Sequence, residues 1–168
     1  MSPVDSIHTP EGQIISLFPS GTSLNENKEL LIGGCLASEL VSTFGTPALI
    51  IDEAALRDRA RRYRDGLRSR WPNSEVIWAS KSLPLTSVFR LLGEEGLGVD
   101  VAGGGELVMA LAAGINPAKI VMHGNAKTDD EIEMAVKAGV GTIVIAVSYT
   151  HLRAHETGRN LVCRLLLE

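Results

Sequence analysis

A lysine, an aspartate and a histidine lie at or near the ends of stretches that are typical of buried strands. Lys81 directly follows the apolar run "VIWAS", Asp100 lies within "GLGVDVA", and His123 comes near the end of "AKIVMHG". A partly desolvated lysine has a lowered pKa, and its neutral amine attacks carbonyl carbons to form a Schiff base. A lysine at a strand end can equally extend its ammonium into water. Position alone therefore leaves Lys81 open between a nucleophile and a surface charge.

The neighbouring polar residues are also open to two interpretations. A carboxylate within an apolar strand is costly without a partner, and Lys81 on the adjacent predicted strand is a candidate partner for Asp100. The glycines from Gly103 to Gly105 can approach a phosphate, although a tight strand-to-helix turn is the simpler interpretation. His123 by itself is more typical of a hydrogen-bonded structural histidine than of a catalyst.

The spacing of apolar residues predicts strands that alternate with helices. The predicted strands are residues 47–52, 74–80, 96–102, 118–124 and 141–146. The predicted helices are residues 53–70, with Leu56, Ala60, Tyr63 and Leu67 on one stripe, then 85–95, 106–114 and a helix that a Thr128–Glu131 capping box starts and Gly139 ends. Strand–helix units repeating every ~20–25 residues indicate a parallel sheet and an α/β fold.

Two α/β folds begin with such units, the Rossmann sheet and the (β/α)8 barrel. No G-x-G-x-x-G motif follows the first predicted strand, which argues against a dinucleotide-binding sheet. We therefore expect a partial TIM-type (β/α)8 barrel with about five of its eight strands, and an active site at the carboxyl ends of those strands. The expected domains are an N-terminal segment at residues 1–45, the partial barrel at 46–146 and a tail at 147–168.

Composition excludes several classes of protein. A net charge of −4 argues against a nucleic-acid partner, and the seven arginines from Arg57 to Arg70 are expected to form a solvated helix face. The sequence has no signal peptide and no membrane-spanning stretch, so we expect a cytoplasmic protein without a membrane partner. Cys35 and Cys163 form neither a disulfide framework nor a metal knuckle. Residues 1–29 lack periodicity and are predicted to be a loose or docking segment.

Three motifs together carry a resemblance to a known family. "WASKSLP", "GLGVDVAGGGEL" and "VMHGNAKTDDEIEMAVKAG", in this order and spacing, resemble the fold-type III pyridoxal-phosphate decarboxylases, which have alanine racemase-like barrels. The resemblance is strongest to the diaminopimelate decarboxylase group and runs from about residue 30 to about residue 146. It implies that pyridoxal 5′-phosphate is attached to Lys81, the catalytic lysine, and that Asp100, Glu106, His123 and Asn125 lie near the cofactor.

The resemblance also implies an activity and an assembly. Such an enzyme acts on a small amino-acid substrate, here converting meso-diaminopimelate to L-lysine and CO2 in lysine biosynthesis, and works as a homodimer. Decarboxylation of ornithine, arginine or another amino acid is an alternative, as is a non-catalytic barrel that only binds the cofactor; a Schiff-base aldolase is a weaker one. The phosphate-binding, ring-nitrogen and proton-donor residues of the family fall later in its sequence, so the 168-residue chain is expected to be an inactive fragment. Gly103 stands where the family usually has serine, which puts one local hydrogen bond in doubt.

The tail departs from the strand–helix rhythm after Ala146. His151 and His155 have the spacing of some zinc-binding helices, but no third ligand is evident, and we predict no metal site. A short surface helix carrying Leu161, Leu165 and Leu166 is one alternative. The tail also resembles a translated sequencing-adapter peptide, and we hypothesise that residues from about Val147 are not native.

Overall fold

The computed structural model describes residue 15, residues 17–145 and residues 161–162. The internal contacts of the chain divide it within one helix, into an N-terminal unit, Met1–Arg59, and a C-terminal unit, Ala60–Glu168. The boundary predicted between residues 45 and 46 rests on a composition change and a resemblance, and it stays a prediction.

The N-terminal unit contains a small antiparallel sheet in the order β1-β2-β3. Its elements are β1 (Thr22–Leu24), β2 (Leu30–Ile32), β3 (Cys35–Leu36) and the helix α2 (Ala37–Phe44). Strand β1 lies within the segment that was predicted to be loose, so that prediction is wrong at these residues. The side-chain oxygen of Asn25 accepts hydrogen bonds from the backbone N–H groups of Asn27 and Glu29, and this local turn, which periodicity does not reveal, joins β1 to β2.

Residues 47–52 form no strand, which corrects the first strand predicted from the sequence. Leu49 is 79% exposed, and no other described strand pairs with this segment. A short apolar run satisfies only the pattern of a strand, whereas a strand also needs a partner for its backbone hydrogen bonds. Helix α3 (Glu53–Arg68) follows directly, and the Asp52 carboxylate caps it by accepting from the N–H of Ala55 at 3.0 Å.

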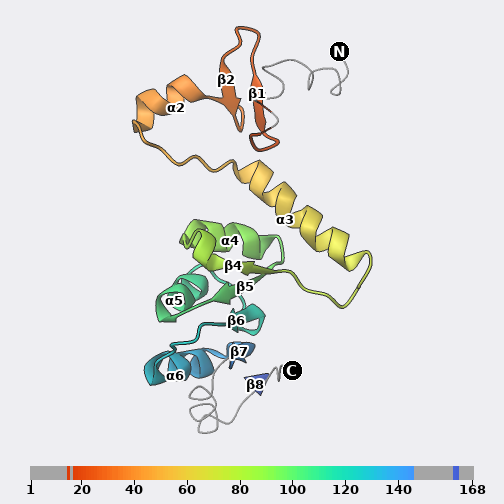
Figure 1. The fold of residues 1–168 in the computed structure, drawn as a ribbon, viewed down its shortest axis with the longest axis vertical. Coiled ribbons are helices and arrows are strands. Elements are labelled where there is room, and N and C mark those ends of the chain that lie inside the picture. Colours follow the sequence, from red (N-terminus) through yellow and green to blue (C-terminus); the bar gives the residue numbers. More distant parts are fainter. Residues whose placement is uncertain (1–14, 16, 146–160, 163–168) are drawn as a thin grey trace. The chain divides into compact units, whose positions relative to one another are not determined.

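The C-terminal unit is built on a parallel sheet in the order β4-β5-β6-β7-β8 (Figure 1). Its strands are β4 (Ile77–Ala79), β5 (Gly98–Val101), β6 (Ile120–Met122), β7 (Thr142–Val144) and β8 (Leu161–Val162). Its helices are α4 (Thr86–Glu94), α5 (Gly104–Ala112) and α6 (Asp129–Ala138), with short 3₁₀ turns η2 (Ser80–Ser82) and η3 (Pro117–Lys119). The α/β fold with a parallel sheet is confirmed, and β4 to β7 lie within predicted strands.

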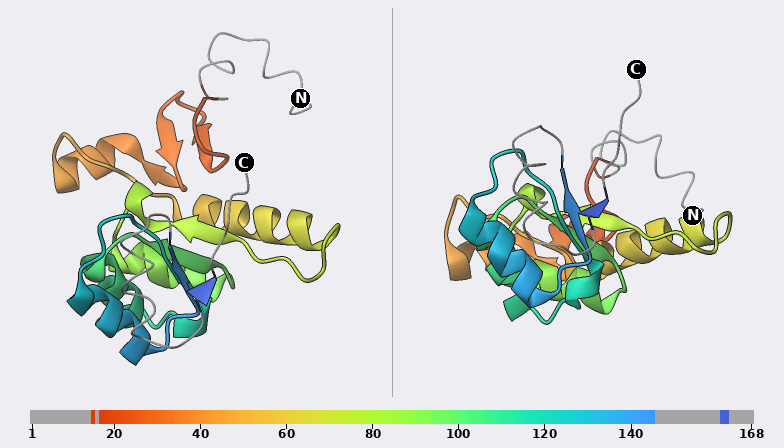
Figure 2. Two further views of the ribbon diagram at one scale, coloured as in Figure 1. Left: turned by 60° about the horizontal axis from the view of Figure 1, so that its bottom comes forward. Right: turned by 90° about the horizontal axis from the view of Figure 1, so that it is seen from below.

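Helices α4, α5 and α6 cover one face of this sheet, and no other helix of the described C-terminal unit covers the opposite face. Figure 2 shows α4, α5 and α6 gathered on one side of the strands. The buried cluster between them joins strand and helix residues: Phe89, Val99, Val101, Leu107, Ala110, Ile115, Ile120, Met122, Ala135 and Ile143. Because successive strand residues point to opposite faces, Ala79, Asp100 and Val121, which are register partners, lie on the other face.

Helix α6 begins and ends as the sequence predicts. The Thr128 hydroxyl accepts from the N–H of Glu131 at 3.3 Å, and a Glu131 carboxylate oxygen accepts from the N–H of Thr128 at 2.8 Å. Gly139 ends the helix in the left-handed region with φ 78°. The capping box is therefore confirmed.

Two helix details differ from the predictions. Helix α5 begins at Gly104, so the glycine turn forms the first turn of the helix. In α3, Tyr63 is 65% exposed although it was placed on the buried stripe with Ala60. The reason is a polar contact at another face: Arg61 forms a salt bridge of 3.1 Å with Glu95, and the Arg64 guanidinium donates to the Glu95 carbonyl. Part of the arginine run therefore binds protein groups.

Strand β8 was not predicted. Leu161 and Val162 pair in parallel with Ile143 and Val144 of β7, so a surface helix at these two residues is wrong. The other tail predictions, the His151 and His155 pair and a non-native origin from about Val147, fall outside the described residues apart from β8.

Candidate active site at the carboxyl ends of the strands

The three polar strand ends singled out in the sequence lie at one edge of the sheet. Ala79, Asp100 and Val121 are register partners across β4, β5 and β6. Lys81 follows Ala79 by two residues, and His123 follows Val121 by two. The parallel sheet therefore brings Lys81, Asp100 and His123 to neighbouring positions at its carboxyl edge, where barrel enzymes carry their chemistry.

Asp100 lies closest to the histidine of this group. Its Oδ2 is 3.7 Å from Nδ1 of His123, and its Oδ1 is buried with no hydrogen-bond partner among the described residues. Burial raises the pKa of Asp100; the charge of His123 opposes that rise, Glu106 adds to it, and Lys81 opposes it. The expected pairing of Asp100 with Lys81 is thus a longer-range electrostatic interaction, and the nearer partner is His123.

Lys81 lies in the turn η2 that directly follows β4. Its side chain is exposed, whereas the preceding residue, Ser80, is fully buried. The N–H of Leu83 donates to the carbonyl of Ser80 at 3.0 Å, which closes the turn around the lysine. The backbone of this turn is therefore anchored at Ser80 while the Lys81 amine is free to reach outward.

Glu106 is bound by protein groups at this edge. Its Oε2 accepts from the Ser80 hydroxyl at 2.8 Å and from the N–H of Ala102 at 2.7 Å. Glu106 stands in the first turn of α5, so a bond to a nearby backbone N–H is what its position predicts. The link to Ser80, 26 residues away in the sequence, was not predicted. The signal that could have suggested it is a small hydroxyl residue at the end of an apolar strand.

The glycine turn after β5 is held by a carboxylate of the protein. The N–H of Gly104 donates to Oε1 of Glu131 at 2.8 Å. Hydrogen bonds from the backbone N–H groups of Thr128 and Gly104 lower the pKa of Glu131. A Cβ at Gly103 would lie 3.2 Å from Glu131 Oε1, so a serine there requires this carboxylate to give way slightly. These contacts favour the tight-turn interpretation of the glycines over a phosphate site.

The loop after β6 is fixed by a buried lysine that sequence reasoning missed. Lys127 is 3% exposed, and its ammonium donates to the carbonyls of Gly124 and of Val144, the latter at 2.8 Å. Burial lowers the pKa of Lys127, and the nearby Glu131 opposes this. This lysine joins the ends of β6 and β7, and His123 and Asn125 in the same loop are exposed. Its type and sequence position are those of an ordinary surface lysine, so no signal marks it.

A cavity of about 420 Å³ opens on the uncovered sheet face beside these strand ends. The residues that line it are Ile77, Ala79, Asp100, Val121, His123, Thr142 and Val144. The cavity is mostly apolar, with Asp100 and His123 as the groups able to change protonation. This composition is typical of a small-molecule site.

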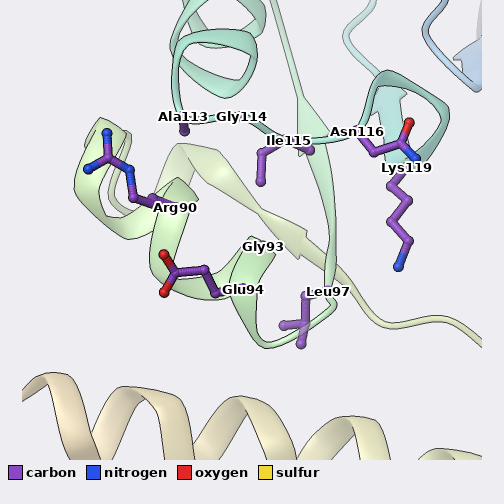
Figure 3. A pocket seen from close by; sticks show the side chains of 9 residues that line it. All are labelled: Arg90, Gly93, Glu94, Leu97, Ala113, Gly114, Ile115, Asn116 and Lys119. Carbon is purple, nitrogen blue, oxygen red and sulfur yellow. The ribbon is translucent and has the colours of Figure 1, made fainter.

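A second cavity, of about 460 Å³, lies at the opposite end of the strands. Figure 3 shows Arg90 and Glu94 on one side of it and Asn116 and Lys119 on the other. Leu97 and Lys119 immediately precede β5 and β6, so this cavity belongs to the amino ends of the strands. In barrel enzymes that end contributes stability.

Among the described residues, no three histidine, cysteine, aspartate or glutamate side chains lie close enough together to hold a metal ion. None of the described helices has both the length and the apolar character needed to cross a membrane.

Known proteins resemble this chain in sequence and in structure. The family model described as "Pyridoxal-dependent decarboxylase, pyridoxal binding domain" matches residues 53–166. A curated diaminopimelate decarboxylase from Actinosynnema pretiosum subsp. auranticum is 43% identical over 129 residues, which are 77% of this chain. The chain spans only 28% of that relative's length.

Two solved structures resemble the fold. A diaminopimelate decarboxylase from M. jannaschii has a TM-score of 0.74 and 26% identity, and the match covers 83% of this chain and 33% of that one. A lysine/ornithine decarboxylase from Vibrio vulnificus, complexed with putrescine, has a TM-score of 0.67 over 83% of this chain and 37% of its own. At 24% identity, this second likeness concerns the fold alone.

Proposed function

Because the chain belongs to the pyridoxal-dependent decarboxylases, whose pyridoxal-binding domain it matches, we propose that Lys81 attaches pyridoxal 5′-phosphate and that the full-length protein is a diaminopimelate decarboxylase. The reaction converts meso-diaminopimelate to L-lysine and CO2. The observation that carries the substrate assignment is the 43% identity to a diaminopimelate decarboxylase over 77% of the chain.

The described residues fit this cofactor at the carboxyl edge of the sheet. A cavity of about 420 Å³ is within the range that holds a small organic ligand. Oδ1 of Asp100 is buried and has no hydrogen-bond partner among the described residues. A donor group of the cofactor or substrate would supply that hydrogen bond. We assign Lys81, Asp100, His123 and Asn125 as the residues around the cofactor.

Two of these residues, Lys81 and Asp100, have distinct tasks in the proposed reaction. Lys81 would supply the amine that holds the cofactor before the substrate amine takes its place. Oδ1 of Asp100, which has no hydrogen-bond partner among the described residues, would accept a hydrogen bond from the ligand, while Oδ2 lies 3.7 Å from Nδ1 of His123. Bound pyridoxal phosphate supplies an electron sink for the electron pair left on Cα when the carboxylate departs as CO2. A proton then takes the place of that carboxylate.

One backbone donor near the site is already occupied. The amide of Gly104 at the start of α5 donates to Glu131. Because the chain spans 28% of the length of the curated relative, we propose that residues farther along the full-length protein bind the phosphate. This supports the proposal that the 168-residue chain alone does not decarboxylate amino acids. We also keep as proposals a homodimeric, cytoplasmic full-length protein and the division at residues 1–45, 46–146 and 147–168.

The test is a substrate assay on the purified full-length protein with pyridoxal phosphate. We expect CO2 and lysine from meso-diaminopimelate, and neither product from the K81A variant. Release of CO2 from ornithine or arginine instead would replace the substrate assignment. Cofactor binding without CO2 release from any amino acid would show a non-catalytic barrel.

A further inference from the structure

We propose that the hydrogen bond between Ser80 and Glu106 is a positioning pair that sets the location of the Lys81 amine. This inference rests on the proposed function, because it concerns the lysine that attaches the cofactor. It also changes the role of Glu106, which the sequence resemblance placed among the residues near the cofactor. Glu106 then holds Ser80, and through it the position of Lys81, and does not contact a ligand.

The contacts of Glu106 explain why it acts indirectly. One carboxylate oxygen, Oε2, accepts both the Ser80 hydroxyl at 2.8 Å and the N–H of Ala102 at 2.7 Å. Hydrogen bonds of this length to a carboxylate are charge-assisted and stronger than those between neutral groups. The two donors come from the end of β4 and from the junction between β5 and α5. The carboxylate therefore ties two adjacent strand ends together.

The buried hydroxyl of Ser80 needs this hydrogen bond to Glu106. It is 0% exposed, so water cannot replace the carboxylate as partner of its hydroxyl. Its backbone is the inner end of the η2 turn, whose other side is closed by the hydroxyl of Ser82 donating to the Ala79 carbonyl at 2.8 Å. Lys81 lies between these two serines. Movement of Ser80 away from Glu106 would move the lysine along with it.

Ser80 and Ser82, which flank Lys81, give a matched pair of variants. S80A removes the hydroxyl that reaches Glu106, whereas S82A removes a hydroxyl from the same turn that does not. E106Q keeps an oxygen able to accept both hydrogen bonds, and E106A removes it. All four are made in the full-length protein, and S80A with E106Q decides the question if E106A does not fold.

Two measurements report on the position of Lys81 rather than on the stability of the fold. The first is the pKa of Lys81 in the cofactor-free protein, obtained from the pH dependence of its competitive acetylation rate. The second is the Kd of pyridoxal phosphate. We expect S80A and E106A each to shift the Lys81 labelling profile and to weaken cofactor binding about tenfold or more. We expect the double variant S80A/E106A to be no weaker than the worse single variant, and S82A to stay within about threefold of wild type. E106Q keeps an acceptor oxygen but loses the charge that strengthens both hydrogen bonds, so we expect it to fall between wild type and E106A.

The outcomes separate this inference from the function on which it rests. If S80A lowers the thermal stability but leaves the Lys81 labelling profile and the cofactor Kd unchanged, the pair is only structural and the inference is overturned. Equal effects of S80A and S82A would overturn it too. If wild-type protein does not attach the cofactor at Lys81 at all, the proposed function fails before the positioning pair is tested.

Discussion

At the scale of single residues, the carboxylate of Asp100 is costly to bury where it lies in the sheet. It combines partial burial, one oxygen without a partner among the described residues, and a nearby imidazole. Burial raises its pKa, which means that its charged form is disfavoured in the folded protein. A residue kept at such a cost to stability is typical of a binding or catalytic site.

This cost predicts a pH-dependent effect of D100N. The folded state binds the Asp100 proton more tightly than the unfolded state, so its contribution to stability is complete below the unfolded pKa. That contribution is lost as the pH rises through the folded pKa. We expect D100N to be more stable than wild type at neutral pH, with the difference shrinking toward acidic pH. Urea unfolding at a series of pH values measures it, and a difference that is constant with pH would contradict the assignment.

At the scale of elements, the carboxyl edge is held by pairs of loop contacts. Glu106 joins the ends of β4 and β5, and Lys127 joins the ends of β6 and β7. Gly124 brings the β6 loop against β5, because a Cβ there would lie 2.5 Å from the Ala102 carbonyl oxygen. These contacts place the polar strand ends more firmly than the short strands alone would.

The hydrogen bonds of Lys127 predict that K127M lowers the stability of the protein. The substitution keeps most of the side-chain length but leaves the carbonyls of Gly124 and Val144 without their donor. We expect a loss of about 1–3 kcal/mol in the free energy of unfolding. The matched control is K137M, because Lys137 is exposed and forms an i,i+4 pair with Glu133, worth about 0.3–0.5 kcal/mol. Equal losses of unfolding free energy in the two variants would show that the hydrogen bonds of Lys127 do not stabilise the ends of β6 and β7.

Gly124 predicts a backbone effect. Its φ of +89° and its approach to Ala102 both exclude a side chain. We expect G124A to lower the free energy of unfolding by about 1–3 kcal/mol, as for other strained backbone positions. Denaturant unfolding measures it, with G105A as the control, since no atom lies within 4 Å of a Cβ at Gly105. A G124A protein as stable as G105A would contradict the described loop.

The sequence pattern predicted those elements whose signals are local. The capping box at Thr128 and Glu131 and the apolar strands around Trp78, Val99 and Val121 needed no knowledge of distant residues. Residues 47–52 had an apolar run without a pairing partner among the described strands, so the same signal misled there. Ser80 with Glu106, and Lys127 with Val144, are contacts between distant positions, and periodicity carries no information about them.

At the scale of the whole molecule, we propose that the chain supplies the lysine side of a pyridoxal-phosphate site. It spans 28% of the length of a curated relative, and the Gly104 amide at the start of α5 already donates to Glu131. We predict that the 168-residue chain has no measurable decarboxylase activity, whereas the full-length protein has it. Activity of the isolated chain in the same CO2 assay would refute this.

The tail raises a question that belongs to the gene rather than to the fold. The family match extends to residue 166, and β8 pairs with β7, whereas the sequence resembles adapter-derived peptide from about Val147. We expect the native reading frame to depart from this chain after about codon 146. Sequencing of the source locus checks it, and an uninterrupted frame through residue 168 in native DNA would disprove the adapter hypothesis.

Chemical trapping shows whether Lys81 attaches the cofactor. Full-length protein is incubated with pyridoxal phosphate, reduced with borohydride, digested and mapped by mass spectrometry. The account predicts a pyridoxyl group on Lys81 and none on Lys127, whose ammonium is buried and bound to backbone carbonyls. A label on Lys127 or any other lysine, with Lys81 unmodified, would contradict it.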